Sequence, residues 1–165
     1  MTASVEIRPY AEADWKGMWP ILQATIQAGD TYVFDPGMSR DEALAYWFHT
    51  GNSAWVLEEA GSILGIYIVK PNQPALGSHV ANAAFMVSPA ARGAGVGRRM
   101  GEHCLAQARA MGFRAMQFNF VVSTNEAAVR LWKQLGFEIV GTLPGAFRHA
   151  TLGYVDAYVM FRKLA

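Results

Sequence analysis

Apolar side chains recur along this chain with two different periods, and the changes of period predict an ordered series of strands and helices. A short strand is expected at residues 6–9. The helix that follows carries apolar side chains at helical spacing, namely Trp15, Met18, Trp19, Leu22 and Ile26. Gly29 ends this helix, an aromatic loop follows, and the capping-box pattern of Ser39 and Glu42 opens a second helix that runs through residue 48.

The rest of the chain alternates between strands and helices. Its predicted elements are, in order, strands at 54–58 and 63–69, a connecting loop at 70–78, a strand at 79–87, a helix at 96–111, a strand at 115–122, a helix at 125–135, and strands at 137–143 and 154–162. The last two strands are expected to be joined by a loop that contains Pro144, Arg148 and His149. The complete order is βααβββαβαββ.

Composition and charge narrow the classes of function. The chain has 165 residues, of which 52% are hydrophobic and 16% charged, and its net charge is +1. We therefore expect one globular domain over residues 1–165. The charges are scattered, which argues against a nucleic-acid partner. No apolar segment resembles a signal-peptide core or a membrane span, so we expect a cytoplasmic protein without a membrane partner.

Cysteine and histidine form neither a disulfide pattern nor a metal pattern. Cys104 is the single cysteine, so an intrachain disulfide is impossible, and its place on an apolar helical stripe predicts that it packs in the core. The four histidines lack the spacing of metal ligands, so we expect no metal.

The segment after the strand at 79–87 is the most informative part of the sequence. Pro89 ends the strand, and Arg92-Gly-Ala-Gly-Val-Gly-Arg98 leads directly into a helix. Glycines at such a junction let the backbone approach a ligand closely, and the helix directs free N–H groups at it, which favours a phosphate-bearing ligand. The segment has neither the P-loop nor the dinucleotide-binding glycine pattern. Taken alone, it is also compatible with an ordinary strand-to-helix turn.

A second segment of the sequence, read together with the glycine segment, gives the chain a specific resemblance to a known family. Arg92-x-x-Gly95-x-Gly97 resembles the acyl-CoA pyrophosphate loop of the GNAT superfamily of N-acetyltransferases, and Asn125-Glu-Ala-Ala-Val-Arg-Leu-Trp-Lys-Gln-Leu-Gly-Phe137 resembles the family's helix beside the pantetheine arm. The resemblance covers nearly the whole chain. It implies an α/β fold with a mixed, mostly antiparallel sheet and helices on both faces, acetyl-CoA as co-substrate, and a homodimer.

The resemblance also implies which residues hold acetyl-CoA. They are Met86, Val87, Arg92, Gly93, Ala94, Gly95, Val96, Gly97, Arg98, Asn125 and Trp132. Backbone N–H groups near Met86 and Val87 are expected to polarise the acetyl carbonyl. Asn125 is equally suited to cap its helix, and the two roles are compatible.

Two proton-transfer groups typical of the family are missing here. Trp132 stands where many members have a tyrosine that protonates the departing thiolate, and an indole has no usable acid at neutral pH. We therefore expect Trp132 to pack against the cofactor. The strand at 79–87 has no carboxylate that could act as a base. Positioning and electrostatics are then expected to supply most of the rate.

Two asparagines interrupt apolar strands, where asparagine is unfavourable. Asn82 and Asn119 either satisfy backbone groups in the sheet or face the acyl-transfer cleft. Together with the segment from Asn119 to Asn125 they are similar to acetyltransferases that act on L-azetidine-2-carboxylate, a proline analogue. That similarity implies catalytic roles for Asn82 and Asn119, with Asn82 at the substrate carboxylate. The other expected substrate-binding residues are aromatic: Tyr32, Phe34 and Phe120.

The sequence thus predicts an acetyl-CoA-dependent N-acetyltransferase whose acceptor is the amine of a small amino acid or an analogue of one. Two alternatives stay open. One is a protein N-terminal acetyltransferase of the ribosomal-protein type, which would need an open peptide groove. The other is a non-catalytic acyl-CoA-binding sensor, because the usual tyrosine is absent.

Overall fold

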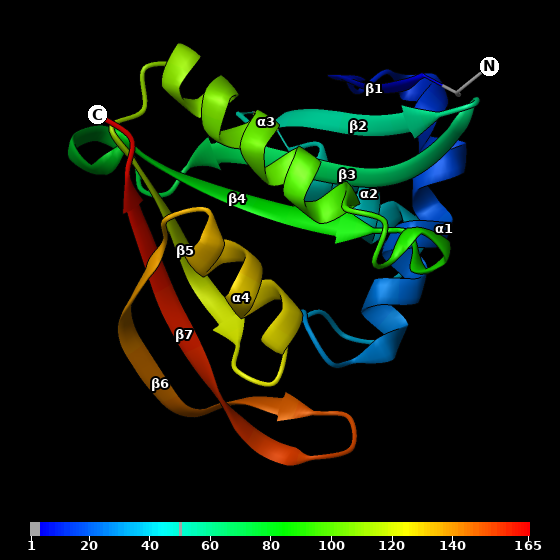
Figure 1. Cartoon of the computed structure of the whole chain (residues 1–165). Coiled ribbons are helices and arrows are strands. Elements are labelled where there is room, and N and C mark those ends of the chain that lie inside the picture. Colours follow the sequence, from blue (N-terminus) through cyan, green and yellow to red (C-terminus); the bar gives the residue numbers. More distant parts are fainter. Residues whose placement is uncertain (1–3, 50) are drawn as a thin grey trace.

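A single mixed sheet organises the molecule (Figure 1). The computed structural model describes residues 4–49 and 51–165. Within them the strands are β1 (Val5–Pro9), β2 (Ser53–Glu59), β3 (Ser62–Pro71), β4 (Val80–Val87), β5 (Ala115–Val122), β6 (Glu138–His149) and β7 (Gly153–Lys163). The spatial order is β1-β2-β3-β4-β5-β7-β6. Neighbouring strands are antiparallel except for β4 and β5, which are parallel.

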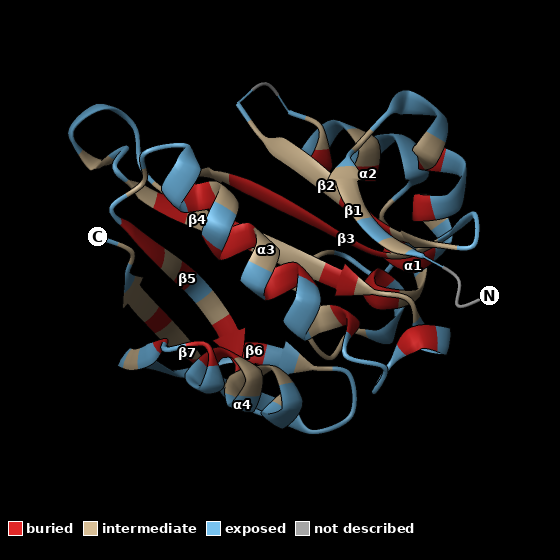
Figure 2. Cartoon of the chain, turned by 45° about the horizontal axis from the view of Figure 1, so that its top comes forward, coloured by how far each residue is buried: buried red, intermediate tan, exposed pale blue. Residues whose placement is uncertain are grey.

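The helices cover both faces of this sheet and create two cores (Figure 2). On one face, α1 (Trp15–Ala28) and α2 (Arg40–Trp47) bury side chains against β2, β3 and β4. On the other face, α3 (Val96–Ala110) and α4 (Glu126–Gln134) pack over β3, β4 and β5. Cys104 is fully buried in this second core, as expected. The predicted element order and fold class are confirmed.

The predicted helix boundaries follow from local chemistry. The Ser39 hydroxyl accepts the Glu42 N–H at 3.2 Å, and the Glu42 carboxylate accepts the Ser39 N–H at 2.7 Å, so the capping box opens α2 as the sequence indicated. Gly29 ends α1 in the left-handed region, at φ 62°, where a residue without a Cβ is favoured.

The C-terminal hairpin differs from the prediction. The expected loop with Pro144, Arg148 and His149 is instead part of β6, which pairs with β7 as far as His149 opposite Gly153. The register shifts between Leu143 and Phe147, and this irregularity accommodates the proline. Since β6 is the edge strand of the sheet, the missing proline N–H breaks no ladder within the interior. The pairing of β6 with β7 therefore determines the structure here, although Pro144 by itself favours a turn.

The centre of the sheet opens between β4 and β5. Their pairing is limited to Val80 with Ala115 and Ala81 with Met116, after which the two strands diverge. At the point of divergence, the Asn82 side-chain Nδ2 donates to the Gln117 carbonyl at 2.9 Å. The amide thereby replaces the next ladder bond. Beyond it, backbone groups of both strands face an opening, which we call the β4–β5 opening.

Candidate active site

One edge of β4 is paired with β3 and the other edge faces the β4–β5 opening. The Asn72 N–H donates to the Val80 carbonyl at 2.8 Å, and the Ser88 N–H donates to the Leu64 carbonyl at 2.8 Å. Between these two points, residues bonded to β3 alternate with residues that are not. Every second residue of β4 therefore directs its N–H and C=O towards β5.

This alternation separates the two amides expected to polarise the acetyl carbonyl. Met86 belongs to the set that faces β3, opposite Ile66, and its side chain is buried against α1. Phe85 and Val87 belong to the set that faces the β4–β5 opening. The structure therefore favours Val87 over Met86 as an amide available to a ligand there.

Tyr32 occupies the backbone groups of Phe85. Its hydroxyl accepts the Phe85 N–H at 3.0 Å and donates to the Phe85 carbonyl at 2.6 Å. Burial raises the pKa of the Tyr32 phenol well above its ordinary value, although the bond to the Phe85 backbone lowers it. The phenol is therefore neutral at physiological pH, and it ties the loop between α1 and α2 to β4.

The glycine loop leaves an open space at the start of α3. Gly93 and Gly95 both have φ +79°, and a Cβ at either position would meet nothing within 4 Å. The first bond within the helix runs from the Arg99 N–H to the Gly95 carbonyl at 3.1 Å, so the preceding N–H groups of the first turn have no acceptor within the helix. Open space beside free N–H groups fits a diphosphate.

The two expected phosphate-binding arginines differ in their surroundings. Arg98 donates to the Gln134 side chain at 2.6 Å and pairs with Glu102 at 3.3 Å, which connects α3 to α4. Arg92 is exposed beside the open loop, as are its neighbours up to Gly95, Ala94 among them. Val96 is buried below the loop. At Gly97 an added Cβ would lie 3.4 Å from Leu131, so space there is tighter.

Asn125 and Trp132 both have clear structural roles. The Asn125 side chain caps α4 by accepting the Ala128 N–H at 3.4 Å. Trp132 is buried among aromatic rings, with ring centroids 4.8 Å from Phe85 and 4.7 Å from Phe118. These positions place the indole between α4 and the β4–β5 opening.

A row of amide side chains lines the α1/α2 side of the β4–β5 opening. Asn82 lies at the point of divergence, and Asn119 lies two residues beyond its partner Gln117 on β5. The exposed Asn119 donates to the Asn72 Oδ1 at 2.7 Å and accepts from the Gln117 Nε2 at 2.9 Å. We call Asn72, Asn82, Gln117 and Asn119 the amide row. Asn82 thus satisfies a backbone group of the sheet, which is one of the two roles considered from the sequence. Its side chain also belongs to the row that lines the β4–β5 opening.

Aromatic side chains flank this row on the α2 side. Tyr32 stacks on Phe34 at 5.7 Å, and Phe34 meets the Tyr46 ring edge-on at 4.8 Å. We call these three rings the aromatic wall. Phe120 is not among them, because it is half-buried beside Phe147, 6.2 Å away.

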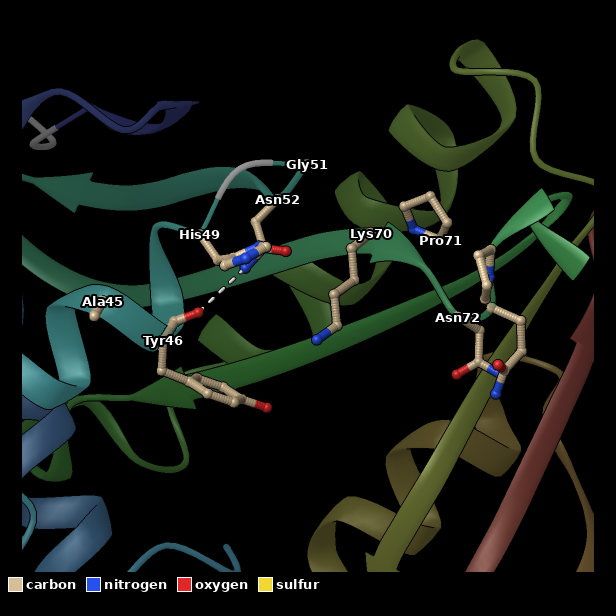
Figure 3. Close-up of a pocket in the computed structure, with 10 residues that line it drawn as sticks. Ala45, Tyr46, His49, Gly51, Asn52, Lys70, Pro71 and Asn72 are labelled. Atoms are coloured by element: carbon tan, nitrogen blue, oxygen red, sulfur yellow. Dashed lines mark hydrogen bonds between the residues drawn. The ribbon is translucent and has the colours of Figure 1, made fainter.

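Beyond the aromatic wall lies a cleft of about 490 Å³ between the end of α2 and the end of β3. Tyr46, His49, Asn52, Lys70 and Asn72 line it, and we call it the α2–β3 cleft (Figure 3). Asn52 holds the segment after α2 in place by donating to the carbonyls of Tyr46 at 3.4 Å and Trp47 at 3.1 Å. Sequence reasoning missed Tyr46, Lys70 and Asn72, since no spacing pattern links them.

The described residues, 4–49 and 51–165, contain no cluster of potential metal ligands. In the same part of the chain, no helix has both the length and the apolar character that a membrane crossing requires.

Comparisons with known proteins find relatives of this chain in sequence and in fold. The N-acetyltransferase aca1 of Schizosaccharomyces pombe is 35% identical over 151 residues, which cover 81% of this chain and 72% of that protein. A GCN5-related N-acetyltransferase from Kribbella flavida superposes with a TM-score of 0.92 at 43% identity, covering 96% of this chain and 97% of that one. The yncA acetyltransferase of Salmonella typhimurium, solved with acetyl-CoA, has the same fold, with a TM-score of 0.86 at 24% identity over 98% and 95% of the chains.

The model of the acetyltransferase (GNAT) family matches residues 15–137, which contain the glycine loop, the β4–β5 opening and α4. The chain therefore belongs to the GNAT family of acetyltransferases, and it is an acyltransferase with acetyl-CoA as co-substrate.

Proposed function

We propose that this N-acetyltransferase moves the acetyl group to the amine of a small amino acid or amino-acid analogue. The observation that carries the proposal is the amide row beside the aromatic wall at the mouth of the β4–β5 opening. Amide groups bind the polar atoms of a small acceptor, and the rings restrict its size. A cationic polyamine would instead call for carboxylates, and neither β4 nor β5 contains one.

The residues of the glycine loop are proposed to hold the other substrate. The free N–H groups at the start of α3 and the exposed Arg92 would bind the diphosphate, with Asn125 and Trp132 beside the pantetheine arm. The Val87 N–H would then polarise the acetyl carbonyl. Tyr32 is proposed to act as a positioning residue, because its hydroxyl holds the Phe85 N–H and carbonyl.

The proposed transfer needs no side chain that is negatively charged. Asn119 orients the neutral acceptor amine, whose lone pair forms the new C–N bond while the C–S bond breaks and the thiolate leaves. The amine nitrogen then loses a proton to solvent. Since Asn119 is exposed, water can reach this position. Orientation and the Val87 dipole would supply most of the rate.

A thiol-release assay with acetyl-CoA and matched acceptors tests the proposal. The panel contains small amino acids, their carboxamides, polyamines and peptides with a free N-terminus. We expect the highest kcat/KM with small amino acids, and L-azetidine-2-carboxylate and proline test the proline-analogue type directly. Preference for peptides would instead support an N-terminal acetyltransferase. Thermal stabilisation by acetyl-CoA without thiol release from any acceptor would support the sensor.

A further inference from the structure

We infer that Lys70 anchors the carboxylate of the acceptor from the α2–β3 cleft, so that the enzyme requires an acceptor with both an amine and a carboxylate. The inference rests on the proposed function and adds a specificity-determining residue to it. It also revises the role that the sequence suggested for Asn82.

The Lys70 ammonium is held near the amide row without an acidic partner. Lys70 lies directly opposite Asn82 in the β3–β4 pairing, and both side chains are on the face covered by α1 and α2. Its Nζ is 5.5 Å from the centroid of the Tyr46 ring. Among residues 4–49 and 51–165, ion pairs join Arg8 to Asp14 and Glu58 and Arg98 to Glu102, so Lys70 takes part in none.

Asn82 is less suited to this role than Lys70. One N–H of its Nδ2 is already committed to the Gln117 carbonyl, where it closes the sheet at the divergence. A carboxylate needs donors, and Asn82 retains a single N–H for it. Lys70 offers a full positive charge and three donors. Charge-assisted hydrogen bonds to a carboxylate are also the stronger kind.

The Lys70 side chain lies between the α2–β3 cleft and the C-terminal end of β4, where the acetyl group is proposed to bind. Figure 3 shows the ammonium extending from β3 towards the Tyr46 ring. From Tyr46, the aromatic wall continues through Phe34 and Tyr32 to the Phe85 backbone. Lys70 is level with Asn82, three residues along β4 from Phe85, which corresponds to roughly 10 Å. A lysine side chain and an α-amino acid together can span that distance.

The cleft has room for this arrangement and no competing anion. Its volume of about 490 Å³ exceeds that of a small amino acid, and the lining residues that the structure describes include amides, a histidine and no carboxylate. An acceptor whose carboxylate lies at Lys70 would direct its amine towards Asn119. Asn119 is connected to the cleft, because its side chain donates a 2.7 Å hydrogen bond to the cleft residue Asn72.

The test compares Lys70→Met with the unmodified enzyme on an amino acid and on its carboxamide. Methionine keeps an apolar stem against Tyr46 and removes the charge. We expect the KM of the amino acid to rise roughly ten- to a hundredfold, while the KM of the carboxamide changes less than twofold. Lys70→Arg should restore most of the affinity, and Lys163→Met, on the exposed end of β7, is the matched control.

A second measurement does not depend on a variant. Raising the ionic strength should raise the KM of the amino acid in the unmodified enzyme and leave that of the carboxamide unchanged, because salt screens a charge pair. Equal KM changes for both acceptors in Lys70→Met, or no change for the amino acid, would overturn the role of Lys70 while amino-acid acetylation stands. Absence of amino-acid turnover in the unmodified enzyme would overturn the proposed function as well.

Discussion

The Tyr32 hydroxyl makes two hydrogen bonds to one residue, accepting the Phe85 N–H at 3.0 Å and donating to the Phe85 carbonyl at 2.6 Å. These are the backbone groups that the diverging strand β5 leaves without a ladder partner. The Tyr32 side chain, from the loop between α1 and α2, thus satisfies backbone groups of β4 that no neighbouring strand bonds. Since that loop also carries Phe34, the same contact fixes the position of the aromatic wall.

Tyr32→Phe tests this contact directly. The ring is kept, but the Phe85 N–H and carbonyl lose their partner, so we expect the free energy of unfolding to fall by about 1–3 kcal/mol. Urea unfolding measures the change. Tyr46→Phe is the control, because the Tyr46 side chain is exposed and its variant should lose under about 0.5 kcal/mol. Equal stability of both variants would show that the two hydrogen bonds contribute nothing net.

The fold could be predicted where the decisive signals are local. The sequence placed the strand at residues 115–122, and the structure has β5 at Ala115–Val122. The capping box of Ser39 and Glu42 likewise opened α2 where expected. The end of β6 could not be predicted, because its pairing with β7 and the irregularity near Pro144 are tertiary features. Local turn residues such as proline and glycine then point to a loop that does not form.

The candidate site likewise has a part that could be predicted from local sequence and a part that depends on tertiary structure. The glycine loop is contiguous in sequence, so it could be predicted as a phosphate-binding segment without a structure. Tyr46, Lys70 and Asn72 come from α2, β3 and the turn that follows it, and only folding brings them to one cleft. The choice between Met86 and Val87 likewise depends on which edge of β4 pairs with β3, and the sequence does not contain that information.

The glycine loop is tested by Gly95→Val. At φ +79° a valine is strained, which costs about 1–2 kcal/mol in the free protein. Its side chain also fills space that a Cβ now finds empty, so binding of acetyl-CoA should weaken. The unmodified protein should gain about 2.7 kcal/mol at one hundred times the dissociation constant. Gly95→Val should lose most of that gain.

Gly112→Val is the matched control for the loop. Gly112 also has a left-handed φ, of +88°, with nothing within 4 Å of an added Cβ, but it lies at the opposite end of α3. The control should be destabilised by strain and keep the full gain from acetyl-CoA. Thermal unfolding with and without ligand measures both. An undiminished ligand gain in Gly95→Val would remove the loop from the binding site.

Trp132→Phe separates packing from proton transfer. Trp132 is buried beside Phe85 and Phe118, so the smaller ring should destabilise the protein by about 1–3 kcal/mol. An indole cannot act as an acid, and kcat at saturating acetyl-CoA should stay within about threefold. A kcat that falls more than tenfold in the folded variant, with unchanged acetyl-CoA affinity, would assign Trp132 a direct part in the reaction.

Two of the asparagines in the amide row, Asn82 and Asn119, should respond differently to replacement by alanine. Asn82→Ala leaves the Gln117 carbonyl unpaired at the divergence of β4 and β5, so we expect a loss of about 1–3 kcal/mol in unfolding free energy. The exposed Asn119→Ala should change stability by under about 0.5 kcal/mol and lower kcat roughly ten- to a hundredfold. Each variant is the control for the other in urea unfolding and steady-state kinetics. Normal kcat in Asn119→Ala would leave that residue as scaffold.

The contact between Tyr67 and His103, on the α3 side of the sheet, should make the unfolding free energy depend on pH. The hydroxyl of the fully buried Tyr67 and the His103 Nδ1 share a hydrogen bond of 2.8 Å, and burial lowers the pKa of the His103 imidazole. The unfolded chain then binds a proton near pH 6.5, where folded His103 stays neutral. The unfolding free energy should therefore fall as the pH drops below about 6.5, until folded His103 also takes up its proton.

His103→Gln removes the titrating group and leaves a side chain able to hydrogen-bond Tyr67. Its unfolding free energy should depend less on pH between about 6.5 and 5 than that of the unmodified protein, because one of the groups that bind protons differently in the two states is gone. His79→Gln, at an exposed position, is the matched histidine-to-glutamine substitution for this comparison. Urea titrations at a series of pH values measure the slope. Identical slopes for His103→Gln and the unmodified protein would show that folded His103 titrates as freely as it does in the unfolded chain.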